Sequence, residues 1–111
     1  MLQLIGNKKN RDVQKVERYL KERRIPYQYI DISKKELSEK EWKSIFNSVS
    51  DPMDAVDTEG QYYQKNGYAW KDYNPIEEVI NHPELLKLPV LRNGQKCCFT
   101  LDEAFIAEAS K

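Results

Sequence analysis

Four polar residues at a predicted strand-to-helix turn have types and spacing that favour the binding of an anion. An apolar run ends at Gly6, and an amphipathic helical pattern then begins around these four residues: Lys8, Lys9, Asn10 and Arg11. Free backbone N–H groups and the positive end of the helix dipole meet at such a turn. A solvated, basic helix start is the favoured interpretation, and an anion-binding corner formed by these residues is the functional alternative.

The only cysteines are the neighbours Cys97 and Cys98. Because successive side chains of a strand point to opposite faces, one thiol is expected in the core and the other at the surface or near the turn. Adjacent cysteines rarely pair, so no disulfide framework is expected. A structural role is predicted for both, and a reactive thiol on this strand is the alternative. His82 has no Cys or His at ligand spacing, so no metal site is predicted.

The elements that position these residues begin with a strand, a helix and a strand. Leu2, Leu4 and Ile5 ahead of Gly6 predict a short buried strand, and Asn10 is a good helix N-cap. Apolar residues at helical spacing predict a helix from there to about Arg24, and the aromatic, β-branched residues 27–32 predict a second strand. A strand–helix–strand unit of this length indicates a parallel βαβ arrangement.

The rest of the chain reads as a helical block, a hairpin and a closing helix. The start signals of these elements are two capping boxes, a capped proline and a turn dipeptide: Ser38 with Glu41, Thr100 with Glu103, Asn74-Pro75, and Asn93-Gly94. A further short helix is expected over residues 59–66.

This order of elements predicts an α/β, thioredoxin-like fold with a mixed four-stranded sheet. We expect one domain over residues 1–111, with the thioredoxin-like core at about 1–32 and 87–111. A helical insertion at about 33–86 would lie between the two halves of the core.

Two segments of the sequence resemble the arsenate reductase (ArsC) and Spx family of thioredoxin-fold proteins. They are "LIGNKKNRDVQKVERYLKERRIPYQYIDI" and "NPIEEVINHPELLKLPVLRNGQKCCF". The resemblance implies that Pro89 is a cis-proline at the start of the third strand. It also places the family's reactive cysteine at Asn10, and a partner cysteine found in some members at Val13.

The resemblance further implies that the oxyanion-binding arginines of the family are replaced. Their positions fall at Leu88, Phe99 and Asp57, none of which can form a bidentate clamp on an oxyanion. Asn10 is no nucleophile near pH 7, so the sequence predicts no catalytic residue at this turn. Arsenate reduction is therefore not expected, and any residual enzymatic activity is left open.

The first functional hypothesis is a catalytically degenerate family member that works by binding. The ligand would be glutathione, an oxyanion or a protein partner, held by Lys8, Lys9, Asn10, Arg11 and the edge next to Pro89. RNA polymerase is a partner by family analogy only. The alternatives are a glutaredoxin-like thiol oxidoreductase that uses Cys97, Cys98 or bound glutathione, and a domain without a small-molecule role.

Composition limits the other classes of function. The 18 Lys and Arg residues balance the 18 Asp and Glu residues, so direct nucleic-acid binding is not expected. No apolar stretch is long enough for a membrane span and no signal-peptide pattern follows Met1, so a cytoplasmic location is expected. Five aromatic residues lie in residues 61–73. This aromatic segment is predicted to pack in the core, and a protein contact is the alternative.

Overall fold

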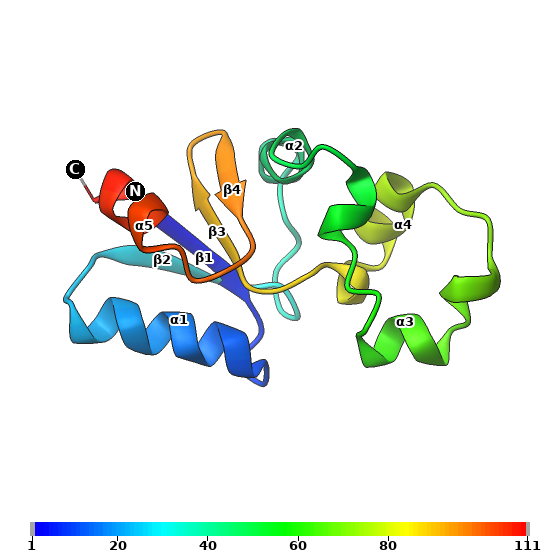
Figure 1. Cartoon of the computed structure of the whole chain (residues 1–111), viewed down its shortest axis with the longest axis horizontal. Helices are drawn as coiled ribbons and strands as arrows, with labels where there is room; N and C mark the ends of the chain where they lie inside the picture. The colour runs from blue at the N-terminus through cyan, green and yellow to red at the C-terminus, as the bar shows by residue number, and fades with distance from the viewer. Residues whose placement is uncertain (1, 111) are drawn as a thin grey trace.

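The computed structural model describes residues 2–110, and its first three elements form a strand–helix–strand unit (Figure 1). They are β1 (Leu2–Gly6), α1 (Arg11–Glu22) and β2 (Tyr27–Asp31). β1 and β2 pair in parallel along their whole length. The βαβ unit predicted from the sequence is therefore confirmed.

α1 ends at Glu22, close to the predicted end at Arg24. Arg24 takes a left-handed conformation with φ of 53°, and the N–H of Ile25 donates to the carbonyl of Leu20 at 3.0 Å. These contacts close the helix and turn Ile25 back against the core.

The block between β2 and the hairpin consists of short helices. They are α2 (Glu39–Asn47), α3 (Gln61–Lys65) and α4 (Pro75–Asn81), with 3-10 turns at Pro52–Ala55, Tyr68–Trp70 and Pro83–Leu85. The predicted short helix over 59–66 is thus confirmed as α3.

Two of the predicted helix starts in this block are confirmed by their hydrogen bonds. The Ser38 hydroxyl accepts the N–H of Glu41 at 3.2 Å, and the Glu41 carboxylate accepts the N–H of Ser38 at 2.8 Å. The Asn74 side chain accepts the N–H groups of Ile76 and Glu77 at the start of α4.

The predicted hairpin completes the sheet. β3 (Val90–Asn93) and β4 (Lys96–Cys98) pair antiparallel, and Gly94 between them has a φ of 63°, which favours glycine. β3 also pairs antiparallel with β1, so the strand order is β2-β1-β3-β4. The predicted α/β fold with a mixed four-stranded sheet is confirmed.

The closing helix α5 (Glu103–Ala109) begins differently from the prediction. Its N-cap is Asp102, whose carboxylate accepts the N–H of Phe105 at 3.0 Å. The predicted capping box of Thr100 with Glu103 is wrong, because Asp102 supplies a cap directly before the helix and Leu101 packs against the core ahead of it.

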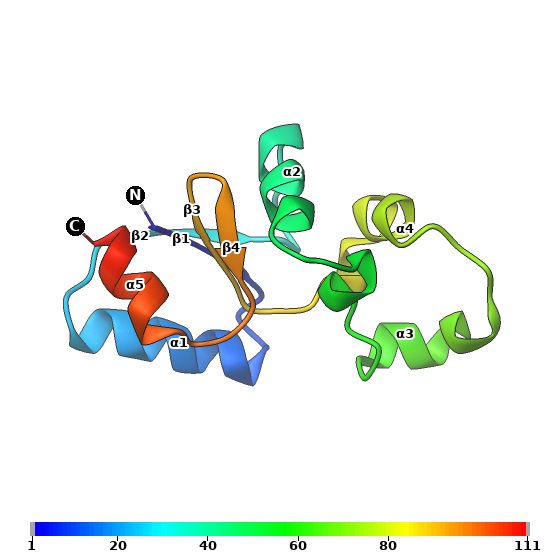
Figure 2. The same ribbon diagram turned by 45° about the horizontal axis from the view of Figure 1, so that its top comes forward.

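The sheet separates two hydrophobic clusters. Ile5, Ile30 and Val90 face the helical block, together with Trp42 and Ile45 of α2. On the other face, α1 and α5 cover the sheet, with these buried residues: Leu2, Leu4, Val13, Val16, Leu20, Leu91 and Ile106. Figures 1 and 2 show α1 and α5 at one side of the sheet and α2 standing beside the hairpin.

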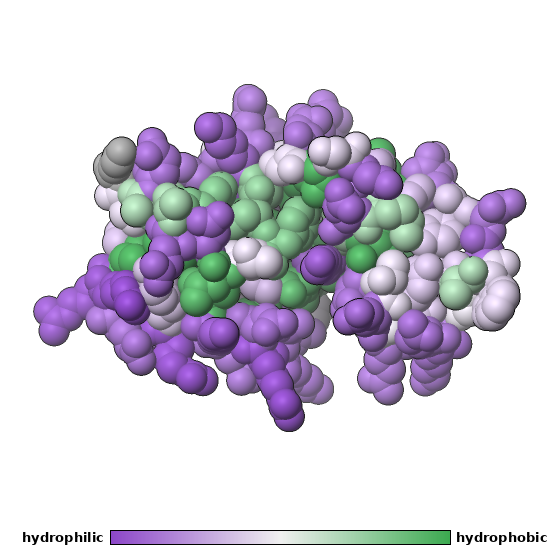
Figure 3. Space-filling view, in the orientation of Figure 1, coloured by the Kyte–Doolittle hydropathy of each residue, from purple (hydrophilic) through white to green (hydrophobic). Residues whose placement is uncertain are grey.

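The surface is mixed in character. Figure 3 shows hydrophilic side chains along the edge formed by α1, and hydrophobic side chains in the middle of the same face, over β3 and β4. None of the helices within residues 2–110 is long and apolar enough to cross a membrane.

Candidate functional site

The turn between β1 and α1 is held by its own asparagines. The Asn10 side-chain oxygen accepts the N–H of Asp12 at 2.9 Å and that of Val13 at 3.0 Å. The Asn7 side chain accepts the N–H of Lys9 at 2.9 Å, and the Asn7 carbonyl accepts the N–H of Asn10 at 3.0 Å. The predicted N-cap at Asn10 is therefore confirmed.

Gly6 allows this turn to lie against the helix. A Cβ atom at Gly6 would lie 2.6 Å from both methyl groups of Val13. Because only glycine fits between the end of β1 and the first turn of α1, Gly6 allows the strand and the helix to pack closely here.

The peptide bond between Leu88 and Pro89 is cis, as the family resemblance implied. Pro89 is buried and precedes Val90, which pairs with Ile5 near the end of β1. The turn before α1 and the cis-proline therefore lie at the same end of the sheet.

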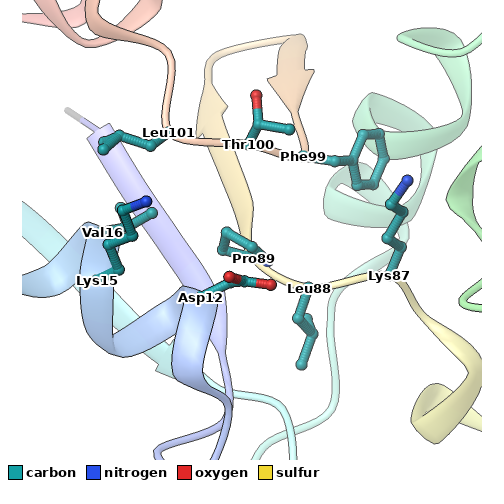
Figure 4. A pocket seen from close by; sticks show the side chains of 9 residues that line it. All are labelled: Asp12, Lys15, Val16, Lys87, Leu88, Pro89, Phe99, Thr100 and Leu101. Carbon is teal, nitrogen blue, oxygen red and sulfur yellow. The ribbon is translucent and has the colours of Figure 1, made fainter. Parts of the chain in front are cut away.

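A cavity of about 350 Å³ opens beside Pro89, between α1, the segment before β3 and the segment after β4. We call it the proline cavity. Its lining is formed by Asp12, Lys15, Val16, Lys87, Leu88, Pro89, Phe99, Thr100 and Leu101 (Figure 4). It combines apolar walls with two cations and one carboxylate, which suits a small ligand that carries charges of both signs.

Three charged side chains of the proline cavity were not singled out by sequence reasoning. Figure 4 shows the Asp12 carboxylate pointing toward Leu88 and Pro89, with Lys15 and Lys87 on opposite sides. Asp12, Lys15 and the core residue Val16 have i, i+3 and i+4 spacing, which was the available signal for a shared helix face. Lys87 comes from a distant segment and had no such signal.

The predicted corner residues do not line the proline cavity. Lys8, Lys9 and Arg11 are exposed, and Asn10 is tied into the helix cap. A hydrogen bond from Ser33 lowers the pKa of Asp31, and the positive charges of Lys34 and Lys8 add to this lowering. Of the residues predicted to bind, the structure brings only Pro89 into this cavity.

The two thiols lie on opposite faces of β4, as the strand pattern predicted. Cys97 packs toward the helical block and Cys98 toward α1 and α5. Burial raises the pKa of each thiol to about 11. Both line an adjoining cavity of about 570 Å³, which shares Lys87, Phe99 and Thr100 with the proline cavity, but neither thiol lines the proline cavity itself. A raised pKa and partial burial favour a structural role.

Two of the positions where the resemblance places oxyanion-binding arginines lie at the proline cavity. Leu88 and Phe99 line it with apolar side chains. Asp57 does not line it, and its N–H donates to the carbonyl of Leu85 at 2.8 Å.

The aromatic segment, residues 61–73, is mostly packed inside the helical block. Tyr63 and Tyr68 are buried and stack with ring centroids 5.8 Å apart, whereas Trp70 is 93% exposed. The Nδ1 atom of His82 lies 3.2 Å from the hydroxyl oxygen of Tyr62, within hydrogen-bond distance. Within residues 2–110, no group of three or more His, Cys, Asp or Glu side chains could hold a metal ion.

Several solved structures share the fold of this chain. A YFFB protein is 19% identical, with a TM-score of 0.79 over 100% of both chains. An arsenate reductase from Vibrio cholerae is 13% identical, with a TM-score of 0.77 over 97% of this chain and 96% of that chain. An arsenate reductase (ArsC) related protein from Brucella melitensis is 20% identical, with a TM-score of 0.70 over 93% of this chain and 88% of that chain.

No protein-family model and no curated protein sequence matches this chain. The similarity to the solved structures therefore establishes the fold, which is the ArsC-like thioredoxin fold that the resemblance implied.

Proposed function

We propose that this chain is a catalytically degenerate relative of the arsenate reductases that binds a small anionic thiol peptide, with glutathione as the representative ligand. The proposal rests on one observation: the cavity beside the cis-proline is open and charged, and none of its lining residues is a cysteine. Fold alone does not set function, so the residues of the site must support the activity.

The first step concerns the reactive position. Asn10 stands at the helix start where the resemblance places the family's cysteine, and both hydrogen bonds accepted by its side chain stabilise the helix. A carboxamide does not ionise near neutral pH, so it supplies no attacking group. Cys97 and Cys98 do not replace it, because they lie outside the cavity and burial raises their pKa values.

The second step concerns the oxyanion. Arsenate reduction requires a thiolate and cations that hold a tetrahedral anion. Leu88 and Phe99 present apolar surface to the proline cavity instead. The cavity is therefore better suited to the body of a peptide than to a compact oxyanion.

The third step concerns the ligand. Glutathione carries two carboxylates and one ammonium group on an extended backbone. Lys15 and Lys87 provide two cations for the carboxylates, and Asp12 provides a carboxylate for the ammonium group. Leu88 and Pro89 line the cavity between these charges and provide apolar surface for the body of the peptide.

A glutathione titration tests this proposal. We expect saturable changes in the amide shifts of Asp12, Val16 and Leu88. The Lys15→Gln/Lys87→Gln variant should bind glutathione with a dissociation constant at least tenfold larger. A Lys21→Gln/Lys65→Gln variant removes two exposed lysines elsewhere and is the matched control.

Absence of saturable shifts, or equal weakening in the control variant, would reject glutathione binding at this cavity. Glutathione-dependent disulfide reduction is measured in parallel. Turnover that disappears in Cys97→Ser/Cys98→Ser would instead support the glutaredoxin-like alternative. A regulatory protein partner, RNA polymerase included, stays a prediction from the family analogy.

A further inference from the structure

A second charged cavity lies away from Pro89, between α2 and the β3–β4 hairpin. It has a volume of about 390 Å³, and we call it the hairpin cavity. One face of α2 forms one wall, and Arg92 with the turn residues Gly94 and Gln95 forms the other. Figures 1 and 2 both show the hairpin turn beside α2.

The two walls are held together by a hydrogen bond. The Ser44 hydroxyl of α2 lies 3.2 Å from the carbonyl oxygen of Gly94, and it also donates to the Lys40 carbonyl at 2.9 Å. Ser44 is buried, although the surrounding lysines are exposed. The cavity is therefore formed by packed elements and not by a loose loop.

The charge of the hairpin cavity has one sign. Lys40, Lys43 and Arg92 line it, and no carboxylate is among its lining residues. Glu39 pairs with Lys43 at 3.4 Å, but both side chains are mostly exposed, so the pair is weak and a bound anion can compete for Lys43. Three cationic side chains thus line one cavity, although the formal net charge of the whole chain is zero.

Arg92 is held in place on β3 by a hydrogen bond to the neighbouring strand. Its Nη1 donates to the side-chain oxygen of Gln3 at 2.6 Å, and Gln3 in turn donates to Gln28 at 2.9 Å. The Nε atom of Arg92 is buried and has no hydrogen-bond partner among residues 2–110.

We propose that the hairpin cavity binds a phosphate group, carried by a small phosphomonoester or present as inorganic phosphate. A phosphate dianion offers several acceptor oxygens, which suit a guanidinium together with two ammonium groups. Asn47 and Gln95 add neutral amide groups to the lining. The site lies toward the hairpin turn, whereas Pro89 lies at the opposite end of β3, so it does not depend on the proposed glutathione site.

Titration with inorganic phosphate, and separately with phenyl phosphate, tests the proposal. Sodium chloride and sodium acetate at equal ionic strength are the reference titrations. We expect saturable amide shifts at Ser44, Asn47 and Gln95 with both phosphates, and only small, linear shifts with chloride and acetate.

Variants then assign the site. Lys40→Gln/Lys43→Gln changes two exposed side chains, and we expect it to weaken phosphate binding at least tenfold. Lys34→Gln/Lys35→Gln removes the same charge from another exposed segment and should bind as the unmodified chain does. Arg92→Gln should abolish binding; because Arg92 also supports Gln3, its folding is checked by circular dichroism.

Tighter binding of phenyl phosphate than of inorganic phosphate would identify a phosphomonoester as the ligand, and the reverse order would identify free phosphate. Shifts that follow ionic strength alike in all four salts would overturn the proposal. Equal weakening in the two lysine variants would also overturn it, because binding would then reflect net charge and not the cavity.

Discussion

Asn10 holds the first turn of α1 with a single side-chain oxygen, which accepts the N–H groups of Asp12 and Val13. Asparagine and cysteine differ at such a position in one respect that matters for chemistry. The helix start and nearby cations lower the pKa of a thiol, but they have no ionisable group to act on in a carboxamide. The same electrostatic setting therefore supports a nucleophile in one case and only a cap in the other.

This comparison gives a prediction at the residue scale. In a Cys97→Ser/Cys98→Ser background, an Asn10→Cys thiol should have a pKa below its ordinary value. The original thiols have pKa values raised from 9.0 to about 11. At pH 7, iodoacetamide should therefore alkylate the thiol at position 10 of this variant about 100-fold faster or more than it alkylates Cys97 and Cys98 of the unmodified chain. The reason is that a larger fraction of the new thiol is thiolate.

Asn81→Cys in the same background controls for exposure, since Asn81 is exposed at the end of α4. The thiol at position 81 should react more slowly than the thiol at position 10 and faster than Cys97 and Cys98 of the unmodified chain. Equal rates at positions 10 and 81 would show that the start of α1 does not activate a thiol.

Residue types predicted part of the site. Asn10 was recognised as a cap from local sequence rules, and the cis bond at Pro89 was implied by the family resemblance. The grouping of Lys15 with Lys87 could not be predicted in this way. These side chains line one cavity only after α1 and the segment before β3 have packed on the same sheet.

Among the elements, the local signals predicted the structure correctly where only one cap or turn was available. Asn93-Gly94 forms the predicted hairpin, and Ser38 forms the predicted capping box. At the last helix, Thr100 and Asp102 were both able to cap, and the sequence pattern selected the wrong one. Packing of Leu101 against the core decided between them, and a local rule does not contain that contact.

The contact between β1 and α1 gives a prediction about these two elements. Gly6→Ala should lower the free energy of unfolding by about 1–3 kcal/mol, because the new methyl group would overlap the Val13 side chain at 2.6 Å. Gly6→Ala/Val13→Ala should cost less than the sum of the two single changes, since the smaller side chain makes room. Urea denaturation of the four chains measures this coupling, and strict additivity would contradict the steric explanation.

Across the whole molecule, folding buries several tyrosine hydroxyls and both cysteine thiols in their neutral, protonated form. Burial, followed by a hydrogen bond to Glu78 at 3.0 Å, raises the pKa of Tyr68 to about 12. Burial likewise raises the pKa of Tyr27, Cys97 and Cys98. In each case the unfolded chain loses the proton at a lower pH than the folded chain does.

The resulting prediction concerns alkaline pH. The stabilisation from these groups is complete below their unfolded pKa values, about 9 to 10, and is lost as the pH rises toward 12. Urea denaturation at pH 8, 9, 10 and 11 should therefore give a falling free energy of unfolding. In Tyr68→Phe, the free energy of unfolding should fall less steeply between pH 10 and 11 than in the unmodified chain. An unchanged slope would show that Tyr68 does not contribute to the pH dependence.

The strand order has a consequence for how the molecule is made. β1 lies inside the sheet and needs β3 as its second neighbour, yet Gln3 and Arg92 are 89 residues apart. A ribosome must synthesise the whole helical block before that neighbour exists, and until then one edge of β1 lacks its pairing strand. Such a distant pairing slows folding. The nascent chain therefore carries an open strand edge through most of its synthesis, when a chaperone is best placed to cover it.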